Sequence, residues 1–179
     1  KIEEEFLKLT EKLGADREPL KTICEKLDEC GRDLGLAMKY LYVTAPYSDL
    51  VNYSFEDIQD FASHGLFLYN TLERVKELPE EMFLNYILDH RVNEEEVLPC
   101  RSFFWNELKD RIEGKNAKDA AIEVNYWCAE EATYHSGDDR TLPALTVYRR
   151  GYGRCGEESV FLVNALRSVG IPARQVYVP

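Results

Sequence analysis

The sequence has little of what marks a membrane protein or a nucleic-acid-binding protein. No apolar run approaches the ~18–20 residues that span a bilayer, and the first residues, Lys1 to Glu5, lack the apolar centre of a signal peptide. The net charge is −11, whereas nucleic acids and anionic membranes attract clustered positive charge. We therefore expect no transmembrane segment and no nucleic-acid partner. A cytoplasmic location is favoured, and an exported mature chain stays open.

Cysteines at metal-binding spacing are also missing. The five cysteines, at positions 24, 30, 100, 128 and 155, include no Cys-x-x-Cys pair, which argues against a structural zinc site or a thioredoxin-type motif. Their odd number favours free thiols in a reducing compartment. We expect no metal and no cofactor. Cys24 and Cys128 fall on apolar helix faces and are predicted to be buried.

The charge is distributed unevenly along the 179 residues. From Arg140 onward there are six arginines, no lysine and two glutamates, which makes this segment +4 and leaves −15 for residues 1–139. We interpret the acidic part as a solvated helical surface. With 45% hydrophobic residues, the chain can bury the core of one domain, or of one domain and part of a second.

Apolar residues at helical spacing predict a mainly helical chain over its first two thirds. Ser54 and Asn116 are the predicted N-caps of two of these helices, and Gly14 ends the first of them. Pro79 has the first helical position of another. The predicted helices cover 2–13, 20–27, 34–41, 55–78, 79–87, 95–114 and 117–134.

The pattern changes after His135. Glycine, aspartate (including Asp138) and proline mark 135–153 as a long connection. Helical spacing resumes over 160–169, and Gly170 ends that helix as its C′ residue. The β-branched and aromatic residues of 174–178 predict a strand.

Cys155 stands between glycines at the start of this last helix. The segment reads Gly153-Arg154-Cys155-Gly156-Glu157, and glycine allows a sharp turn and a close approach by another group. A thiolate at a helix N-terminus is stabilised by the macrodipole and by free backbone N–H groups. The same N–H groups can hold an oxyanion during attack on a carbonyl. The residues alone permit either a nucleophile or an inert structural cysteine.

This segment and the run that follows it resemble the nucleophile region of the transglutaminase-like superfamily. The run from Asn164 to Val176 reads Asn-Ala-Leu-Arg-Ser-Val-Gly-Ile-Pro-Ala-Arg-Gln-Val. The resemblance implies a Cys-His-Asp triad on a papain-like α+β fold. Cys155 would attack an amide of a protein or peptide substrate and form a thioester, which water or an amine would then accept.

The resemblance also divides the chain. Residues 1–115 are predicted to form a helical N-terminal extension, and residues 116–179 the N-terminal portion of a transglutaminase-like core, with its first helices and first strand. The family's histidine and aspartate follow the cysteine, but no histidine follows Cys155 here. We therefore expect a core truncated before both residues, missing its C-terminal part and inactive as given. Pairing of Cys155 with His135 is the less favoured arrangement.

Two other functions stay open. One is a non-catalytic helical module that binds a partner, with the cysteine helix as scaffold. The other is peptide N-glycanase-like deglycosylation, because the Gly-Arg-Cys-Gly-Glu string is similar there; it ranks lower since the paired-cysteine zinc site of the eukaryotic forms is missing. The substrate is not specified: Arg149, Arg150 and Arg154 suggest an acidic acyl donor or pairing with helix carboxylates.

Overall fold

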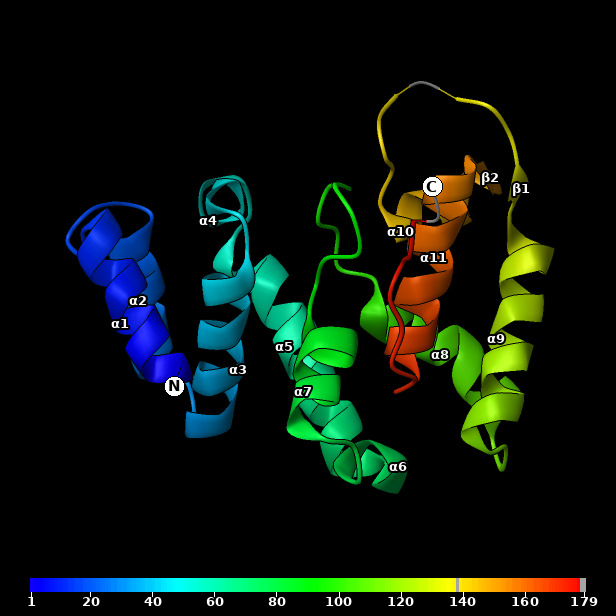
Figure 1. The fold of residues 1–179 in the computed structure, drawn as a ribbon, viewed down its shortest axis with the longest axis horizontal. Helices are drawn as coiled ribbons and strands as arrows, with labels where there is room; N and C mark the ends of the chain where they lie inside the picture. The colour runs from blue at the N-terminus through cyan, green and yellow to red at the C-terminus, as the bar shows by residue number, and fades with distance from the viewer. Residues whose placement is uncertain (138, 178–179) are drawn as a thin grey trace.

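The computed structural model describes residues 1–137 and 139–177, and this part of the chain is mainly helical (Figure 1). It contains eleven α-helices, one short π-helix (η1) and one parallel pair of two-residue strands. In chain order the elements are α1 (Ile2–Leu13), α2 (Leu20–Glu29), α3 (Arg32–Thr44), α4 (Tyr47–Asn52), α5 (Phe55–Thr71), α6 (Glu73–Lys76), α7 (Glu80–Phe83), η1 (Leu84–Leu88), α8 (Arg101–Ile112), α9 (Ala117–Glu131), β1 (Thr133–Tyr134), α10 (Ala144–Arg150), β2 (Tyr152–Gly153) and α11 (Cys155–Ser168).

The helices follow one another along the long axis of the molecule, with α1 and α2 at one end and α9 at the other (Figure 1). The helix that begins at Cys155, α11, packs against α8, α9 and α10. Buried apolar side chains form one contiguous cluster that extends from Phe6 in α1 to Ile171 after α11. The acidic N-terminal helices and the arginine-rich C-terminal segment therefore share a core.

Several helix ends lie where local sequence signals predict them. Ser54 Oγ accepts a hydrogen bond from Asp57 N, and the Asp57 carboxylate accepts one from Ser54 N, each 3.1 Å long. This reciprocal capping satisfies two N–H groups that the helix itself cannot pair. At the other end of the chain Gly170 has φ 75°, and the N–H of Ile171 donates to the carbonyl of Leu166 at 3.0 Å. Gly170 is thus the C′ residue of a Schellman motif, as predicted.

Three predicted helices are longer than the observed ones, and the one over 117–134 is too long because α9 ends at Glu131. The helix over 55–78 breaks at Leu72, between α5 and α6. The helix over 95–114 begins only at Arg101, since Pro99 has no N–H and the residue before a proline avoids the helical region. Glu95 instead closes the preceding loop, because its carboxylate accepts the N–H groups of Val92 at 2.9 Å and Asn93 at 2.7 Å.

The region around the predicted connection over 135–153 also differs. It contains α10 and β2. Residues 133–134, which were predicted to be helical, form β1 instead. A seven-residue helix is too short for helical spacing to identify it.

The predicted strand over 174–178 is wrong for residues 174–177, which form no strand; Val178 lies outside the described residues. A strand requires a pairing partner, and the described residues pair this segment with none. Just before it, the N–H of Ala173 donates to the carbonyl of Tyr86 at 3.1 Å.

Two buried arginines join the C-terminal helices to the loop that follows η1. Arg101 is 2% exposed and donates to the carbonyls of Ile87 at 2.8 Å and Asp89 at 2.9 Å, and to Asn164 Oδ1 at 2.9 Å. Arg167, also 2% exposed, extends the same network. Its Nη1 donates to the carbonyls of Asp89 at 2.8 Å and Arg91 at 2.7 Å, and its Nε to Ala173 O at 2.9 Å.

Burial lowers the pKa of Arg167 to about 10, so it stays charged at neutral pH. Next to Arg101 and Arg167, Arg91 binds Asp49 at 2.7 and 2.6 Å and His90 Nε2 lies 3.1 Å from the same carboxylate. Burial alone would raise the pKa of Asp49, but these hydrogen bonds lower it to about 2.

We expect Arg167→Met to lower the free energy of unfolding by roughly 3 kcal/mol, because the carbonyl groups of Arg91 and Ala173 then lose this donor inside the protein and that of Asp89 is left with Arg101. Urea denaturation measures the change. Arg32→Met is the matched control, since Arg32 is exposed and its replacement should alter stability by less than about 0.5 kcal/mol. Equal stability of the two variants would contradict the role given to Arg167.

Candidate functional site

Cys155 is the first residue of α11 and is exposed, whereas the other four cysteines are not. Cys100 and Cys128 are buried, and burial raises the pKa of each thiol to about 12. Cys128 confirms its prediction. Cys24 does not, since it is only half-buried; burial, followed by the charge of Asp28, raises its pKa. Cys155 is therefore the thiol that a substrate can reach.

A helix–strand–helix turn brings the chain to Cys155. The helix α10 ends at Gly151, whose φ of 72° is left-handed, and β2 follows at once. The strands β1 and β2 are parallel, with Thr133 opposite Tyr152 and Tyr134 opposite Gly153. This pairing holds the backbone two residues before Cys155 against the end of α9.

The two glycines beside Cys155 have different surroundings. A Cβ on Gly153 would lie 3.0 Å from Glu157 Cβ and 3.3 Å from Val147 Cγ1, whereas a Cβ on Gly156 would meet nothing within 4 Å. The predicted close approach of another group to a glycine is therefore present at Gly153, where the side chains of Glu157 and Val147 pack against the backbone. The glycine at 156 leaves open space beside the thiol.

Glu157 fixes the start of α11. This carboxylate is buried and accepts the N–H groups of Arg154 at 2.7 Å and Leu142 at 3.1 Å. The predicted pairing with Arg154 is present, with Arg154 Nε 3.8 Å from Glu157 Oε2. The contact with Leu142 was not predicted, because it joins the helix to the distant loop before α10. The spacing of Glu157 from Arg154 is that of a capping box, the one local signal for this role.

The first turn of α11 has N–H groups, close to the thiol, that no carbonyl of the helix can accept. The N–H of Glu158 is the first in α11 to reach a helical carbonyl, that of Arg154, at 2.8 Å. The N–H groups of Cys155 and Gly156 precede it and have no carbonyl of the helix to bind. Such groups, at the positive end of the helix dipole, stabilise an anion placed beside them.

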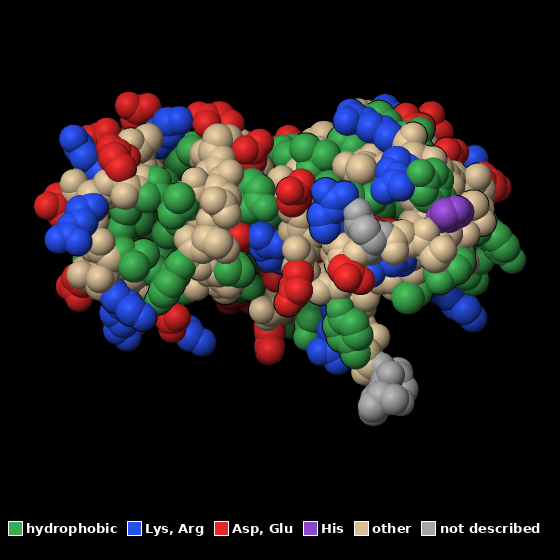
Figure 2. Space-filling model, turned by 90° about the horizontal axis from the view of Figure 1, so that it is seen from above, with side chains coloured by type: hydrophobic (Ala, Val, Ile, Leu, Met, Phe, Trp, Pro, Cys, Tyr) green, Lys and Arg blue, Asp and Glu red, His purple; other side chains and the backbone are tan. Residues whose placement is uncertain are grey.

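Two of the three nearby arginines are used within the protein. Arg154 Nη2 donates to the carbonyl of Arg140 at 2.6 Å. Arg150 donates to the hydroxyl of Tyr152 at 2.8 Å, and its guanidinium lies 4.3 Å from the centre of that ring. Arg149 is exposed. Intramolecular contacts therefore account for Arg150 and Arg154. On the face drawn in Figure 2, acidic and basic side chains are interspersed.

The three histidines lie in different places. His64 is buried, with Nε2 2.9 Å from Ser168 O, and burial lowers its pKa to about 4. His90 is buried against Asp49. His135 is exposed, and its backbone N–H donates to Gly153 O at 2.9 Å. Its ring nitrogen Nδ1 lies 2.6 Å from Ser136 O. In the part of the chain that the structure describes, no histidine ring is hydrogen-bonded to Cys155.

Neither a metal cluster nor a membrane span is found in residues 1–137 and 139–177. Among them, no three His, Cys, Asp or Glu side chains are grouped so that they could hold an ion. No helix there combines the length and apolar character needed to cross a bilayer.

We expect Gly153→Ala to lower the free energy of unfolding by about 1–3 kcal/mol, because the added methyl group overpacks the contact with Glu157 and Val147. Gly156→Ala is the matched control, and its stability should stay unchanged or rise by up to about 1 kcal/mol. Thermal and urea denaturation measure both. The interpretation fails if the two alanine variants are equally stable.

Comparison with known proteins supports the resemblance of the segment that contains Cys155. Residues 106–179 match the family model of the transglutaminase-like superfamily, a segment that runs from within α8 through α11 and includes Cys155. A search of curated proteins and a search of solved structures each found no match. The resemblance predicted from the motif is thus confirmed for residues 106–179, which are similar to the transglutaminase-like superfamily.

Proposed function

We propose that Cys155 is the nucleophile of a thiol-dependent reaction on amide bonds of a protein or peptide, either acyl transfer or hydrolysis. The observation that supports this most directly is the exposed thiol at the first position of α11, inside the segment that matches the superfamily. We further propose that residues 1–115 are an extension and that residues 116–179 belong to the catalytic core.

The chemistry follows from the position of the thiolate. The Cys155 sulfur attacks the carbonyl carbon of the amide, and the oxygen takes up negative charge beside the N–H groups of Cys155 and Gly156. The C–N bond then breaks, and the amine leaves with a proton, so that a thioester remains on Cys155. Water converts the thioester into a carboxylic acid and the free thiol; an amine converts it into a new amide.

Cleavage of an amide by Cys155 also requires proton transfer, from the thiol and to the leaving amine. A general base must lie within hydrogen-bond reach of the thiol, and the described histidines make no such contact with Cys155. The proposal therefore assigns only the nucleophile among these residues. We expect the chain as given to hydrolyse no unactivated amide, whereas an activated ester, whose leaving group needs no proton, should still acylate Cys155.

Alkylation with iodoacetamide tests the activated thiol. Cys155 should be labelled at least ~10-fold faster than Cys24, because it is exposed at a helix N-terminus while burial raises the pKa of Cys24. Peptide mass spectrometry at early times gives the rate at each cysteine in the folded protein. Labelling of Cys155 no faster than Cys24 would overturn the proposal.

Acylation by p-nitrophenyl acetate tests the second step. The expected product is an acetyl group on Cys155, released by hydroxylamine, together with one equivalent of p-nitrophenolate. Cys155→Ala should abolish this product, and Cys30→Ala, at a half-buried cysteine, should leave it unchanged. Acetylation that persists in Cys155→Ala would show that another group reacts.

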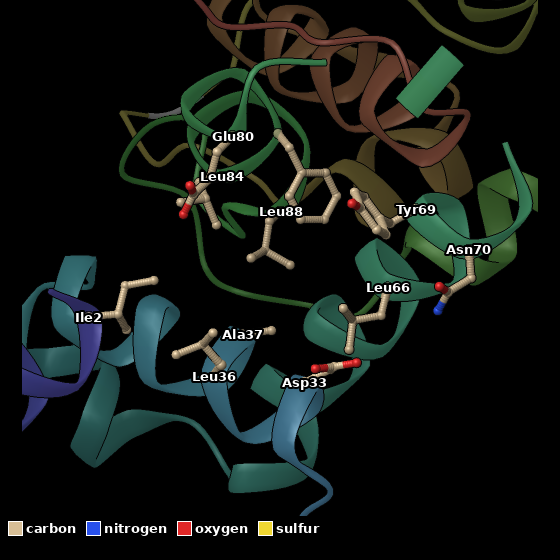
Figure 3. A pocket seen from close by; sticks show the side chains of 11 residues that line it. Ile2, Asp33, Leu36, Ala37, Leu66, Tyr69, Asn70, Glu80, Leu84 and Leu88 are labelled. Atoms are coloured by element: carbon tan, nitrogen blue, oxygen red, sulfur yellow. The ribbon is translucent and has the colours of Figure 1, made fainter. Parts of the chain in front are cut away.

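The alternative is a non-catalytic module, and one feature of the N-terminal helices favours it. An apolar groove of about 320 Å³ lies between α3, α5, α7 and η1. Leu36, Leu66 and Leu84 line it, and the carboxylates of Asp33 and Glu80 stand at its edge (Figure 3). Apolar walls with an acidic edge fit an amphipathic helix that carries basic residues.

A synthetic Leu/Lys amphipathic peptide and its Leu/Glu counterpart test this alternative by fluorescence anisotropy. A module of this kind should bind the basic peptide at least ~10-fold more tightly, and Leu36→Glu, at an exposed lining residue, should weaken that binding. Equal binding of the two peptides, or no effect of Leu36→Glu, argues against the module.

A further inference from the structure

A second groove lies beside Cys155 and has no part in the chemistry above. It has a volume of about 370 Å³ and is formed by α9, β1 and α11. On α11 its lining residues are Glu158, Phe161 and Leu162. Residues three, four and seven positions apart share one face of a helix, so Glu158 and Leu162 continue the face that begins at Cys155. The groove is therefore next to the site where an acyl donor would bind.

Glu158 is the one charged side chain among the residues that line this groove. The remaining lining residues are largely apolar or small: Asn125, Cys128, Ala129, Ala132, Thr133, Tyr134, Phe161 and Leu162. No ion pair to Glu158 is present within residues 1–137 and 139–177. Its neighbour Glu157, in contrast, is buried and bound to the N–H groups of Arg154 and Leu142.

The surroundings of Glu158 favour a cationic partner. Partial burial raises the pKa of this carboxyl group, because burial removes part of the water that solvates the charged form. A cation that enters the groove restores a favourable interaction for that charge. The arginines closest in sequence do not supply it, since Arg150 contacts Tyr152 and Arg154 contacts Arg140 and Glu157.

We propose that this groove binds a lysine or arginine side chain of the acyl donor, with the aliphatic stem against Phe161 and Leu162 and the cationic head at Glu158. This inference rests on the proposed function of Cys155. On a helix, side chains three positions apart have Cβ atoms ~5–6 Å from each other. The lysine or arginine of the acyl donor is therefore the residue next to the attacked carbonyl. Glu158 would determine the specificity for that residue.

Alkylation by matched chloroacetyl amides tests the inference. In this reaction the Cys155 sulfur forms a bond to the CH₂ carbon and chloride leaves. The probes are N-chloroacetyl-lysine amide, N-chloroacetyl-norleucine amide and N-chloroacetyl-glutamate amide, which share the reactive group and differ in the side chain. We expect the lysine probe to label Cys155 at least ~5-fold faster than the norleucine probe, and the glutamate probe to be slowest.

Three variants test whether the preference for the lysine probe comes from binding in the groove or from the overall negative charge of the protein. Glu158→Gln should reduce the lysine-to-norleucine ratio to near one, while Glu113→Gln, which removes the same charge at an exposed position at the end of α8, should leave the ratio unchanged. Ala129→Phe places a ring in the groove at an exposed helix position. It should slow the lysine probe without changing the rate with iodoacetamide.

The outcomes distinguish this inference from the proposed function. If iodoacetamide labels Cys155 rapidly but the lysine and norleucine probes react equally, the cationic groove is wrong and the nucleophile stands. The same holds if Glu158→Gln and Glu113→Gln lower the ratio equally. If iodoacetamide labels Cys155 no faster than Cys24, both the proposed role of Cys155 and the proposed cation-binding groove are wrong.

Discussion

The packing of the C-terminal helices against the N-terminal ones depends on hydrogen bonds from the buried guanidinium groups of Arg101 and Arg167 to backbone carbonyls of residues 87–91. A charge removed from water is stable only if its hydrogen bonds are replaced, and here backbone carbonyls of 87–91 replace most of them. The arginines belong to α8 and α11, while the carbonyls belong to the loop that follows the N-terminal helices. Removal of either side leaves buried polar groups unpaired, so the two parts of the chain are held in one position.

The helices α5 and α6 anchor the C-terminal end of α11 at further points. Arg74 donates to Val169 O at 2.6 Å, and His64 lies 2.9 Å from Ser168 O. Gly170 fits against α6, where a Cβ would come within 2.6 Å of Val75. The N-terminal end of α11 is held separately, by Glu157 and by the β1–β2 pair. Cys155 is therefore exposed on a helix that is fixed at both ends, which is what a preorganised nucleophile requires.

Glu157 and Glu158 show how helical geometry divides the work of two adjacent carboxylates. Consecutive residues on an α-helix point about 100° apart. Glu157 consequently faces inward and caps the backbone, whereas Glu158 lines the groove beside the thiol. The arginines that suggested an acidic acyl donor are used in part to hold the motif together. The charged residue that lines the groove is Glu158, so the partner proposed for the groove is a cation rather than an acidic acyl donor.

The sequence by itself indicated the resemblance of residues 106–179 to the transglutaminase-like superfamily, the helical class and many of the helix ends. Ser54, Asn116 and Gly170 act through bonds to residues three to five positions away, and such local signals can be read without a structure. The proposal that Cys155 is the nucleophile likewise starts from the motif. These features are set by short-range hydrogen bonding and by glycine conformation, which depend little on the rest of the chain.

Only the tertiary structure decided the features that depend on contacts between distant residues. The two-residue strands exist only because 133–134 and 152–153 meet. The half-buried state of Cys24, the contact of Glu157 with Leu142 and the groove at Glu158 follow from how the helices pack. Spacing along a chain specifies which face of a helix is apolar, but not which neighbour covers it, and that choice is made by packing.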